Sequence, residues 1–93
     1  MYIKDERIAI SVLEAVERTS ENFRKVTVNY KQKEGFWVSA YWMQCEPLPL
    51  EIIEKLVQMC TSFPVRLTIS ISAYMLLVSF YAREEKPVGQ SVF

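Results

Sequence analysis

Alternating apolar and polar residues mark two half-exposed β-strands. Over residues 24–31, valine and tyrosine face one side while lysine, threonine and asparagine face the other, and residues 65–71 alternate in the same way. Two further runs, 36–43 and 74–81, carry large apolar residues on both sides. A strand that is apolar on both faces needs a second partner besides its own core, such as another layer, another subunit or a ligand.

Apolar residues at three- and four-residue steps predict two amphipathic helices. The first covers residues 5–19, with Asp5 as its N-cap. The second covers residues 50–61, after a turn that contains Pro49, and Pro64 ends it by forcing the preceding residue into an extended conformation.

Each helix is followed by two strands that we expect to pair as a hairpin. The first connection is a three-residue loop at 33–35 that ends in glycine and sets Tyr30 opposite Val38. The second is a two-residue turn at 72–73, which lacks glycine and asparagine. It brings eight apolar residues to one face in the pairs Ile71–Tyr74, Ile69–Leu76, Leu67–Val78 and Val65–Phe80.

The order of elements predicts one α+β domain over residues 1–86, with a flexible tail at 87–93. Two helices pack on one face of a four-stranded antiparallel sheet in the arrangement αββαββ. A right-handed crossover through the second helix favours strand order 1-2-4-3, in which the strands that are apolar on both sides are central. Segments 5–44 and 47–83 share this pattern, which suggests a two-fold internal repeat.

Composition disfavours catalysis. The chain has no histidine, so it lacks the commonest general base and metal ligand, and no nucleophile or phosphate-loop motif is present. Cys45 and Cys60 lie outside any zinc or redox spacing, and we expect both to be free thiols. We therefore expect neither an enzyme, nor a cofactor, nor a metal site.

Charge and hydropathy bear on partners and location. Eleven basic and eleven acidic residues cancel, so no global field directs the chain to nucleic acid or to anionic lipid. The N-terminus is charged within a few residues and does not resemble a signal peptide, and no apolar run is long enough to cross a bilayer. These features predict a cytoplasmic protein with no membrane partner.

The sheet face turned away from the helices, called the outer face below, is the predicted binding surface. Its apolar residues come from the two central strands, and basic residues border them. The predicted partner-binding residues are Trp37, Tyr41, Met43, Met75, Leu77, Tyr81, Lys25, Lys31, Arg66 and Arg83.

Two functions are compatible with such a face. The first is a non-catalytic protein-interaction module, such as an adaptor, inhibitor or regulatory subunit, most simply a homodimer packed sheet to sheet. The second is a platform for single-stranded nucleic acid, which the balanced charge makes less favourable. In two alternatives the outer face is not an exposed apolar surface. Either the strand register is slipped by one residue, or the first residues and the C-terminal tail cover the face.

Overall fold

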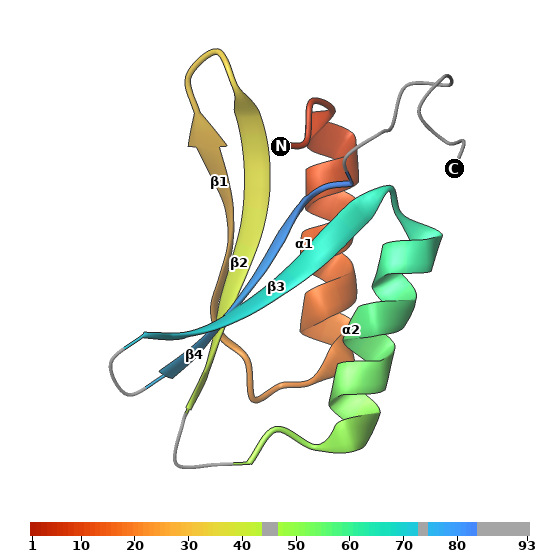
Figure 1. The fold of residues 1–93 in the computed structure, drawn as a ribbon, viewed down its shortest axis with the longest axis vertical. Coiled ribbons are helices and arrows are strands. Elements are labelled where there is room, and N and C mark those ends of the chain that lie inside the picture. The colour runs from red at the N-terminus through yellow and green to blue at the C-terminus, as the bar shows by residue number, and fades with distance from the viewer. Residues whose placement is uncertain (44–46, 73–74, 84–93) are drawn as a thin grey trace, which may run out of the picture.

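The protein folds as an α+β domain, seen in a computed structural model that describes residues 1–43, 47–72 and 75–83 (Figure 1). The strands form one antiparallel sheet in the order β1-β2-β4-β3, and both helices cover the same face. The predicted αββαββ arrangement and strand order are confirmed. The elements are α1 (Glu6–Thr19), β1 (Arg24–Lys31), β2 (Gly35–Met43), α2 (Leu50–Ser62), β3 (Val65–Ser72) and β4 (Met75–Ala82).

Several predictions concern residues that lie outside this description. They are the tail at 87–93, the thiol of Cys45 and the pairing of Tyr74. Within the described ranges, no helix is long and apolar enough to cross a membrane.

Local chemistry sets the ends of both helices. Asp5 caps α1, because its Oδ1 accepts a hydrogen bond from the backbone N–H of Arg7 at 2.9 Å. α2 begins after Pro49, which occupies the N-cap position without a side-chain hydrogen bond. It ends at Ser62, because Phe63 is extended before Pro64 and its N–H donates to the Met59 carbonyl at 2.9 Å.

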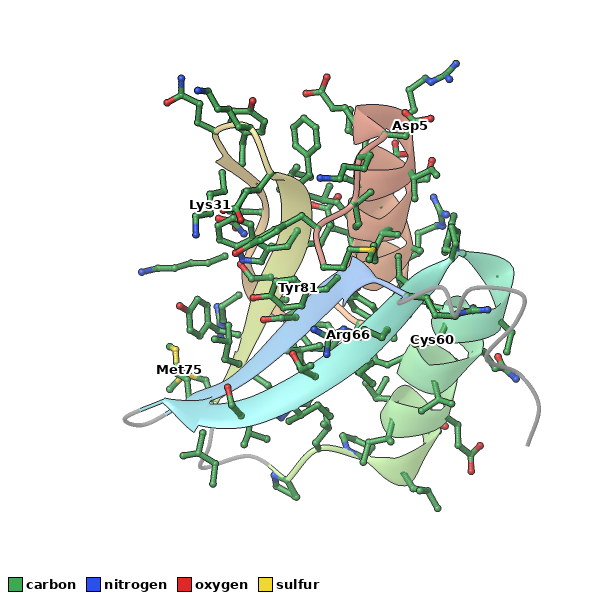
Figure 2. All side chains as sticks on the ribbon, turned by 45° about the horizontal axis from the view of Figure 1, so that its top comes forward. Asp5, Lys31, Cys60, Arg66, Met75 and Tyr81 are labelled. Carbon is green, nitrogen blue, oxygen red and sulfur yellow. The ribbon has the colours of Figure 1, made fainter. Side chains whose placement is uncertain are left out.

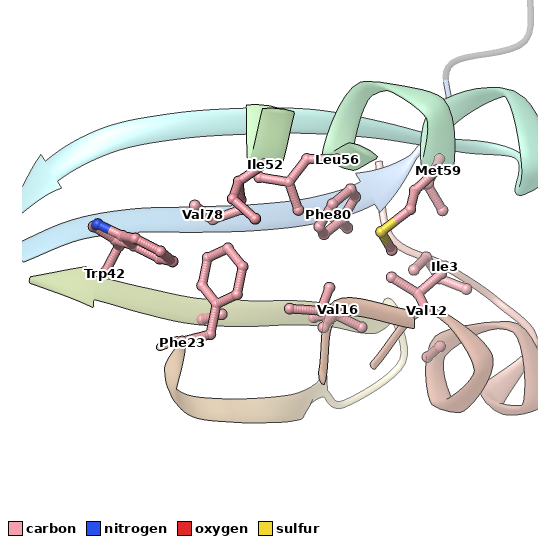
Figure 3. Close-up of a cluster of buried hydrophobic side chains, with 14 residues drawn as sticks. Ile3, Val12, Val16, Phe23, Trp42, Ile52, Leu56, Met59, Val78 and Phe80 are labelled. Carbon is pink, nitrogen blue, oxygen red and sulfur yellow. The ribbon is translucent and has the colours of Figure 1, made fainter. Parts of the chain in front are cut away.

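The core lies between the helices and the inner face of the sheet (Figure 3). Val12 and Val16 of α1 and Leu56 of α2 are fully buried against Phe80 of β4, which is 1% exposed. Burying side chains of this kind contributes roughly 1.5–3 kcal/mol each, so this layer is the main source of stability. The buried apolar residues are Ile3, Ala9, Val12, Val16, Phe23, Val38, Ala40, Trp42, Ile52, Leu56, Met59, Val65, Val78 and Phe80.

The predicted register of the first hairpin is wrong by two residues. Tyr30 pairs with Phe36 instead of Val38, and Lys31 pairs with Gly35. The loop is therefore 32–34, and the left-handed position in it is taken by Lys33, at φ 67°. Because a shift of two residues preserves the alternation, the residues of β1 from Thr27 to Lys31 keep their predicted faces.

The second hairpin differs from its prediction in the same way. Ile71 pairs with Leu76 instead of Tyr74, and Ser72 pairs with Met75, so the connection is 73–74. The shift is again two residues, and the inner and outer sets of β3 and β4 are as predicted.

Residues 1–3 form part of the sheet, which the sequence patterns do not predict. The ladder between β2 and β4 ends at Val38 and Phe80. Beyond that point Ile3 exchanges two backbone hydrogen bonds with Phe36, both 2.8 Å long, and the Ala82 N–H donates to the Met1 carbonyl at 3.0 Å. The N-terminus thus links the two central strands where they separate.

Gly35 makes this arrangement sterically possible. Its φ is 131°, and a Cβ at this position would lie 2.5 Å from the Ile3 carbonyl oxygen and 3.1 Å from the Tyr2 Cβ. Only glycine therefore allows the N-terminal segment to approach the start of β2 this closely.

A β-bulge interrupts the other end of β1. The pairing shifts between Arg24 and Thr27, and Lys25 takes the left-handed conformation at φ 49°. Arg24 consequently lies opposite Tyr41, at the position on the outer face where strict alternation would place Lys25.

Candidate interaction face

The outer face contains all six predicted apolar site residues. Trp37, Tyr41 and Met43 alternate along β2, and Met75, Leu77 and Tyr81 lie on β4. The ladder pairs Tyr41 with Leu77 and Met43 with Met75. All six are half-buried although neither helix lies on this face. Figure 2 shows Lys31, Arg66 and Met75 on the sheet together with Tyr81.

An aromatic cluster of Tyr2, Trp37 and Tyr81 occupies one end of the outer face. The rings of Trp37 and Tyr81 are nearly parallel, 7° apart, with their centroids 6.3 Å from each other. Tyr2 meets both edge-on, at 5.5 Å from Trp37 and 5.8 Å from Tyr81. The alternative in which the first residues cover the face therefore holds at this end, where Tyr2 packs on it. Coverage by the C-terminal tail concerns residues outside the described ranges.

Two cations flank the aromatic cluster. The Arg66 guanidinium carbon lies 5.4 Å from the Tyr81 ring centroid, and the Lys31 Nζ lies 5.8 Å from that of Tyr2. Lys31 also forms an ion pair with Glu34 at 2.9 Å. The hydrogen bond that Lys31 donates to this carboxylate, together with the charge of the carboxylate, raises the pKa of Lys31 above its ordinary value.

Polar side chains cross the middle of the outer face. We call them the serine band: Thr27, Asn29, Ser39, Thr68 and Ser79. The Ser39 hydroxyl accepts from Asn29 Nδ2 at 2.9 Å and lies 3.2 Å from the Thr27 hydroxyl, while Thr68 donates to the Ser79 carbonyl at 3.5 Å. The band separates the aromatic cluster from a second apolar cluster.

This second cluster, called the distal cluster, consists of Tyr41, Met43, Met75 and Leu77. Arg24 lies opposite Tyr41 across the β1–β2 ladder. Methionine side chains adapt to the shape of a partner, so this end of the face suits contacts with irregular apolar groups.

The basic residues predicted around the outer face are not all gathered there. Lys31 and Arg66 flank the aromatic cluster, but the Arg83 guanidinium donates to the carbonyls of Cys60 and Phe63, at the end of α2. Lys25 is the bulged residue of β1, and Arg24 occupies the place predicted for it. The sequence analysis did not predict that Arg24 and Tyr2 lie on the outer face. The spacing of three residues between the apolar Phe23 and Val26, where alternation would give two, was a sign of the bulge.

The charges of the protein are distributed unevenly between its two layers. The four strands carry Arg24, Lys25, Lys31 and Arg66 and no acidic residue. The helices carry five acidic residues against three basic ones: Glu6, Glu14, Glu17, Glu51 and Glu54 against Arg7, Arg18 and Lys55. The balanced total therefore conceals a sheet layer that is positive.

A hollow of about 540 Å³ lies beside the N-terminal segment, between the start of α1 and the end of β4. Its charged residues already have partners: Lys4 donates to the Glu34 carbonyl, Asp5 accepts from Arg7, and Arg83 donates to carbonyls at the end of α2. These side chains therefore do not converge on a common point as catalytic groups would.

The remaining chemistry is limited. Among residues 1–43, 47–72 and 75–83, no three His, Cys, Asp or Glu side chains are grouped to hold a metal ion. Burial raises the pKa of the Cys60 thiol, while the backbone amide of Leu67 and the charge of Arg83 act in the opposite direction. Cys60 is thus a protonated, weakly nucleophilic thiol at neutral pH.

Comparison with protein-family models, with curated proteins and with solved structures found no match to this chain.

Proposed function

We propose that the protein is a non-catalytic interaction module that binds an acidic segment of another protein, bearing apolar or aromatic side chains, across its outer face. The observation that carries this proposal is the combination of two apolar clusters with cations and no acidic residue on the four strands. Aromatic, methionine and arginine side chains are the types enriched at protein interfaces. The absence of histidine from the sequence supports a role without catalysis.

Charge favours such a partner over a second copy packed sheet to sheet. Two outer faces in contact would oppose the cations of Arg24, Lys31 and Arg66 to those of the other copy, and like charges at an interface disfavour association. The serine band would also interrupt the apolar contact between the two faces. An acidic segment would place negative charges against these cations instead. Its backbone could form hydrogen bonds with the polar side chains of the serine band.

Tryptophan fluorescence tests this proposal, because Trp37 lies on the outer face and Trp42 is 2% exposed in the core. The probe is a synthetic peptide that alternates glutamate with leucine and phenylalanine, added to the Trp42→Phe chain, in which Trp37 is the remaining tryptophan. We expect saturable change in Trp37 emission, and loss of at least about tenfold in affinity in Arg66→Glu.

The matched controls are Lys55→Glu, which changes the same charge on α2, and the Trp37→Phe chain, which reports only on Trp42. In Lys55→Glu the affinity for the peptide should be unchanged, which would show that the helices are not involved. In Trp37→Phe the emission of Trp42 should not change when the peptide is added, which would show that the core is not involved. No saturable change of Trp37 emission, or equal losses in Arg66→Glu and Lys55→Glu, would refute the proposal.

A second candidate is binding of single-stranded nucleic acid, which the parallel rings of Trp37 and Tyr81 and the adjacent Lys31 and Arg66 favour. Bases stack on such rings, and basic side chains contact the phosphates. The same fluorescence titration with oligo(dT) distinguishes the two. Nucleic-acid binding would quench Trp37 with an affinity that falls steeply as salt rises. If the oligonucleotide quenches Trp37 emission and the peptide does not, the outer face is a nucleic-acid-binding surface.

A further inference from the structure

The two edges of the sheet differ in their protection against pairing with another chain. The β1 edge has a bulge at Lys25 and carries Arg24, Lys25 and Lys31, features by which proteins block edge pairing. β3, the opposite edge, pairs with β4 without interruption from Val65 to Ser72 and bears a single charge, Arg66.

The exposed backbone groups of β3 follow from its ladder with β4. The Arg83 N–H donates to the Pro64 carbonyl at 2.9 Å, so Pro64 directs its carbonyl toward β4. Antiparallel ladders alternate, so Arg66, Thr68 and Ser70 also bond to β4. Leu67, Ile69 and Ile71 therefore direct their N–H and C=O groups toward the open edge.

α2 covers only the first part of that edge. The backbone amide of Leu67 interacts with the sulfur of Cys60, a residue of α2. Exposure then rises along the strand, from 1% at Val65 to 43% at Ile69 and 69% at Ile71. Among the described residues, the unprotected stretch is therefore Ile69–Ile71, where backbone groups directed toward the edge and exposed isoleucine side chains coincide.

We propose that the protein forms a homodimer in which β3 pairs antiparallel with β3 of a second copy, centred on Ser70. Ile69 of each copy then exchanges backbone hydrogen bonds with Ile71 of the other. The result is a continuous eight-stranded sheet with all four helices on one side. Both outer faces lie on the opposite side and remain accessible, so the dimer does not depend on the function proposed for them.

A second copy fits this edge because the stretch is self-complementary. A two-fold axis at Ser70 sets Ile69 against Ile71 and Thr68 against Ser72, and it leaves Arg66 outside the paired segment. The four isoleucines meet on the inner side of the sheet and cover the most exposed apolar side chains of β3. No like charges are opposed, in contrast to two outer faces packed against each other.

Cross-linking tests the register. Ser70 and its symmetry mate form a non-hydrogen-bonded pair, with Cα atoms about 4.5 Å apart, which is within the range that a disulfide spans. In a chain whose Cys45 and Cys60 are changed to alanine, mildly oxidised Ser70→Cys should form a covalent dimer that reductant reverses. Thr68→Cys, on the same face two residues away, should remain uncross-linked, because its counterpart is Ser72.

Sedimentation of the full chain tests the interface without added cysteines. Ile71→Lys places a charge at the open edge and should raise the dimer dissociation constant at least about tenfold. At concentrations where both chains are monomers, its melting temperature should equal that of the wild type. Ile10→Lys, an exposed isoleucine on α1, should leave dimerisation unchanged, as should Trp37→Asp on the outer face.

Three results would overturn the proposal: a monomer at all concentrations, dimerisation equally affected by Ile71→Lys and Ile10→Lys, or equal cross-linking of Ser70→Cys and Thr68→Cys. Loss of the dimer in Trp37→Asp alone would assign self-association to the outer face.

Discussion

The two faces of the sheet use the same central strands for different purposes. On the inner face, Val38, Ala40, Val78 and Phe80 are at most 1% exposed and carry no charge. On the outer face the intervening residues are half-buried aromatics, methionines and Leu77, with the buried serines Ser39 and Ser79 between them and cations beside them. The difference shows that the apolar content of a strand does not by itself indicate a core. What identifies the second face is its mixture of apolar residues with cations and hydrogen-bonded polar groups.

Adjacent residues of β4 provide the largest test of this difference. Phe80→Ala, on the inner face, should lower the free energy of unfolding by about 3–5 kcal/mol, because it leaves a cavity in the core. Tyr81→Ala, on the outer face, should cost roughly 1–2 kcal/mol, mainly the ring contacts with Trp37 and Tyr2. Urea denaturation measures both. Equal losses would mean that the outer face is a second core.

Gly35→Ala sharpens the comparison at the point where the N-terminus reaches the outer face. The new Cβ would meet the Ile3 carbonyl, and alanine is strained at φ 131°. We expect a loss of about 1–3 kcal/mol in urea denaturation, together with displacement of residues 1–3. Faster amide exchange at Ile3 and Phe36 would show that displacement. Wild-type exchange at these two amides would contradict the role given to Gly35.

Tyr2→Ala should affect the outer face alone and by a smaller amount. Removing this ring exposes Trp37 to water, so the emission of the Trp42→Phe chain should shift to longer wavelength, with less than about 1 kcal/mol lost in stability. Tyr30→Ala, which removes a tyrosine that is 60% exposed and makes no ring contact with Trp37, is the control. The same shift in both variants would exclude a specific cover over Trp37.

The smallest expected effect is the change of stability with pH that comes from Asp5. The two faces should therefore be compared at a pH above the range in which this carboxyl titrates. Hydrogen bonds from Arg7 lower the pKa of this carboxyl below its ordinary value. A lowered pKa stabilises the fold above the unfolded value, and this contribution is lost as the pH falls from about 4 through the folded pKa. Thermal melts should show a decline of the melting temperature in this range that is shallower in Asp5→Ala. Parallel profiles for the two chains would contradict the cap.

The sequence predicted the elements and the faces but not the details that complete the site. Helical periodicity, Asp5 and Pro64 fixed the helices closely, and alternation fixed the strands. Both registers were wrong by two residues, because neither turn has a strong turn residue at the position that decides it: Lys33 takes the left-handed place in the first, and the second lacks glycine. Because both shifts are of an even number of residues, the paired residues outside the bulge still lie on the predicted faces.

The missed residues have different physical causes. Tyr2 belongs to a segment of three residues, too short for any periodicity to register. Arg24 takes the place of Lys25 on the outer face because the bulge inserts an extra residue and shifts the alternation by one position before Thr27. Arg83 was placed on the face by its position after the strand, whereas its long side chain reaches the carbonyls at the end of α2.

The most direct test of the division between the faces is a paired measurement on Trp37→Asp: its thermal unfolding and its binding of the glutamate-rich peptide, the latter followed by calorimetry. A binding surface predicts a folded protein with a melting temperature close to that of the wild type and no detectable heat of peptide binding. A protein that unfolds, or one that binds the peptide with wild-type affinity, would contradict the assignment of the outer face as the interaction surface.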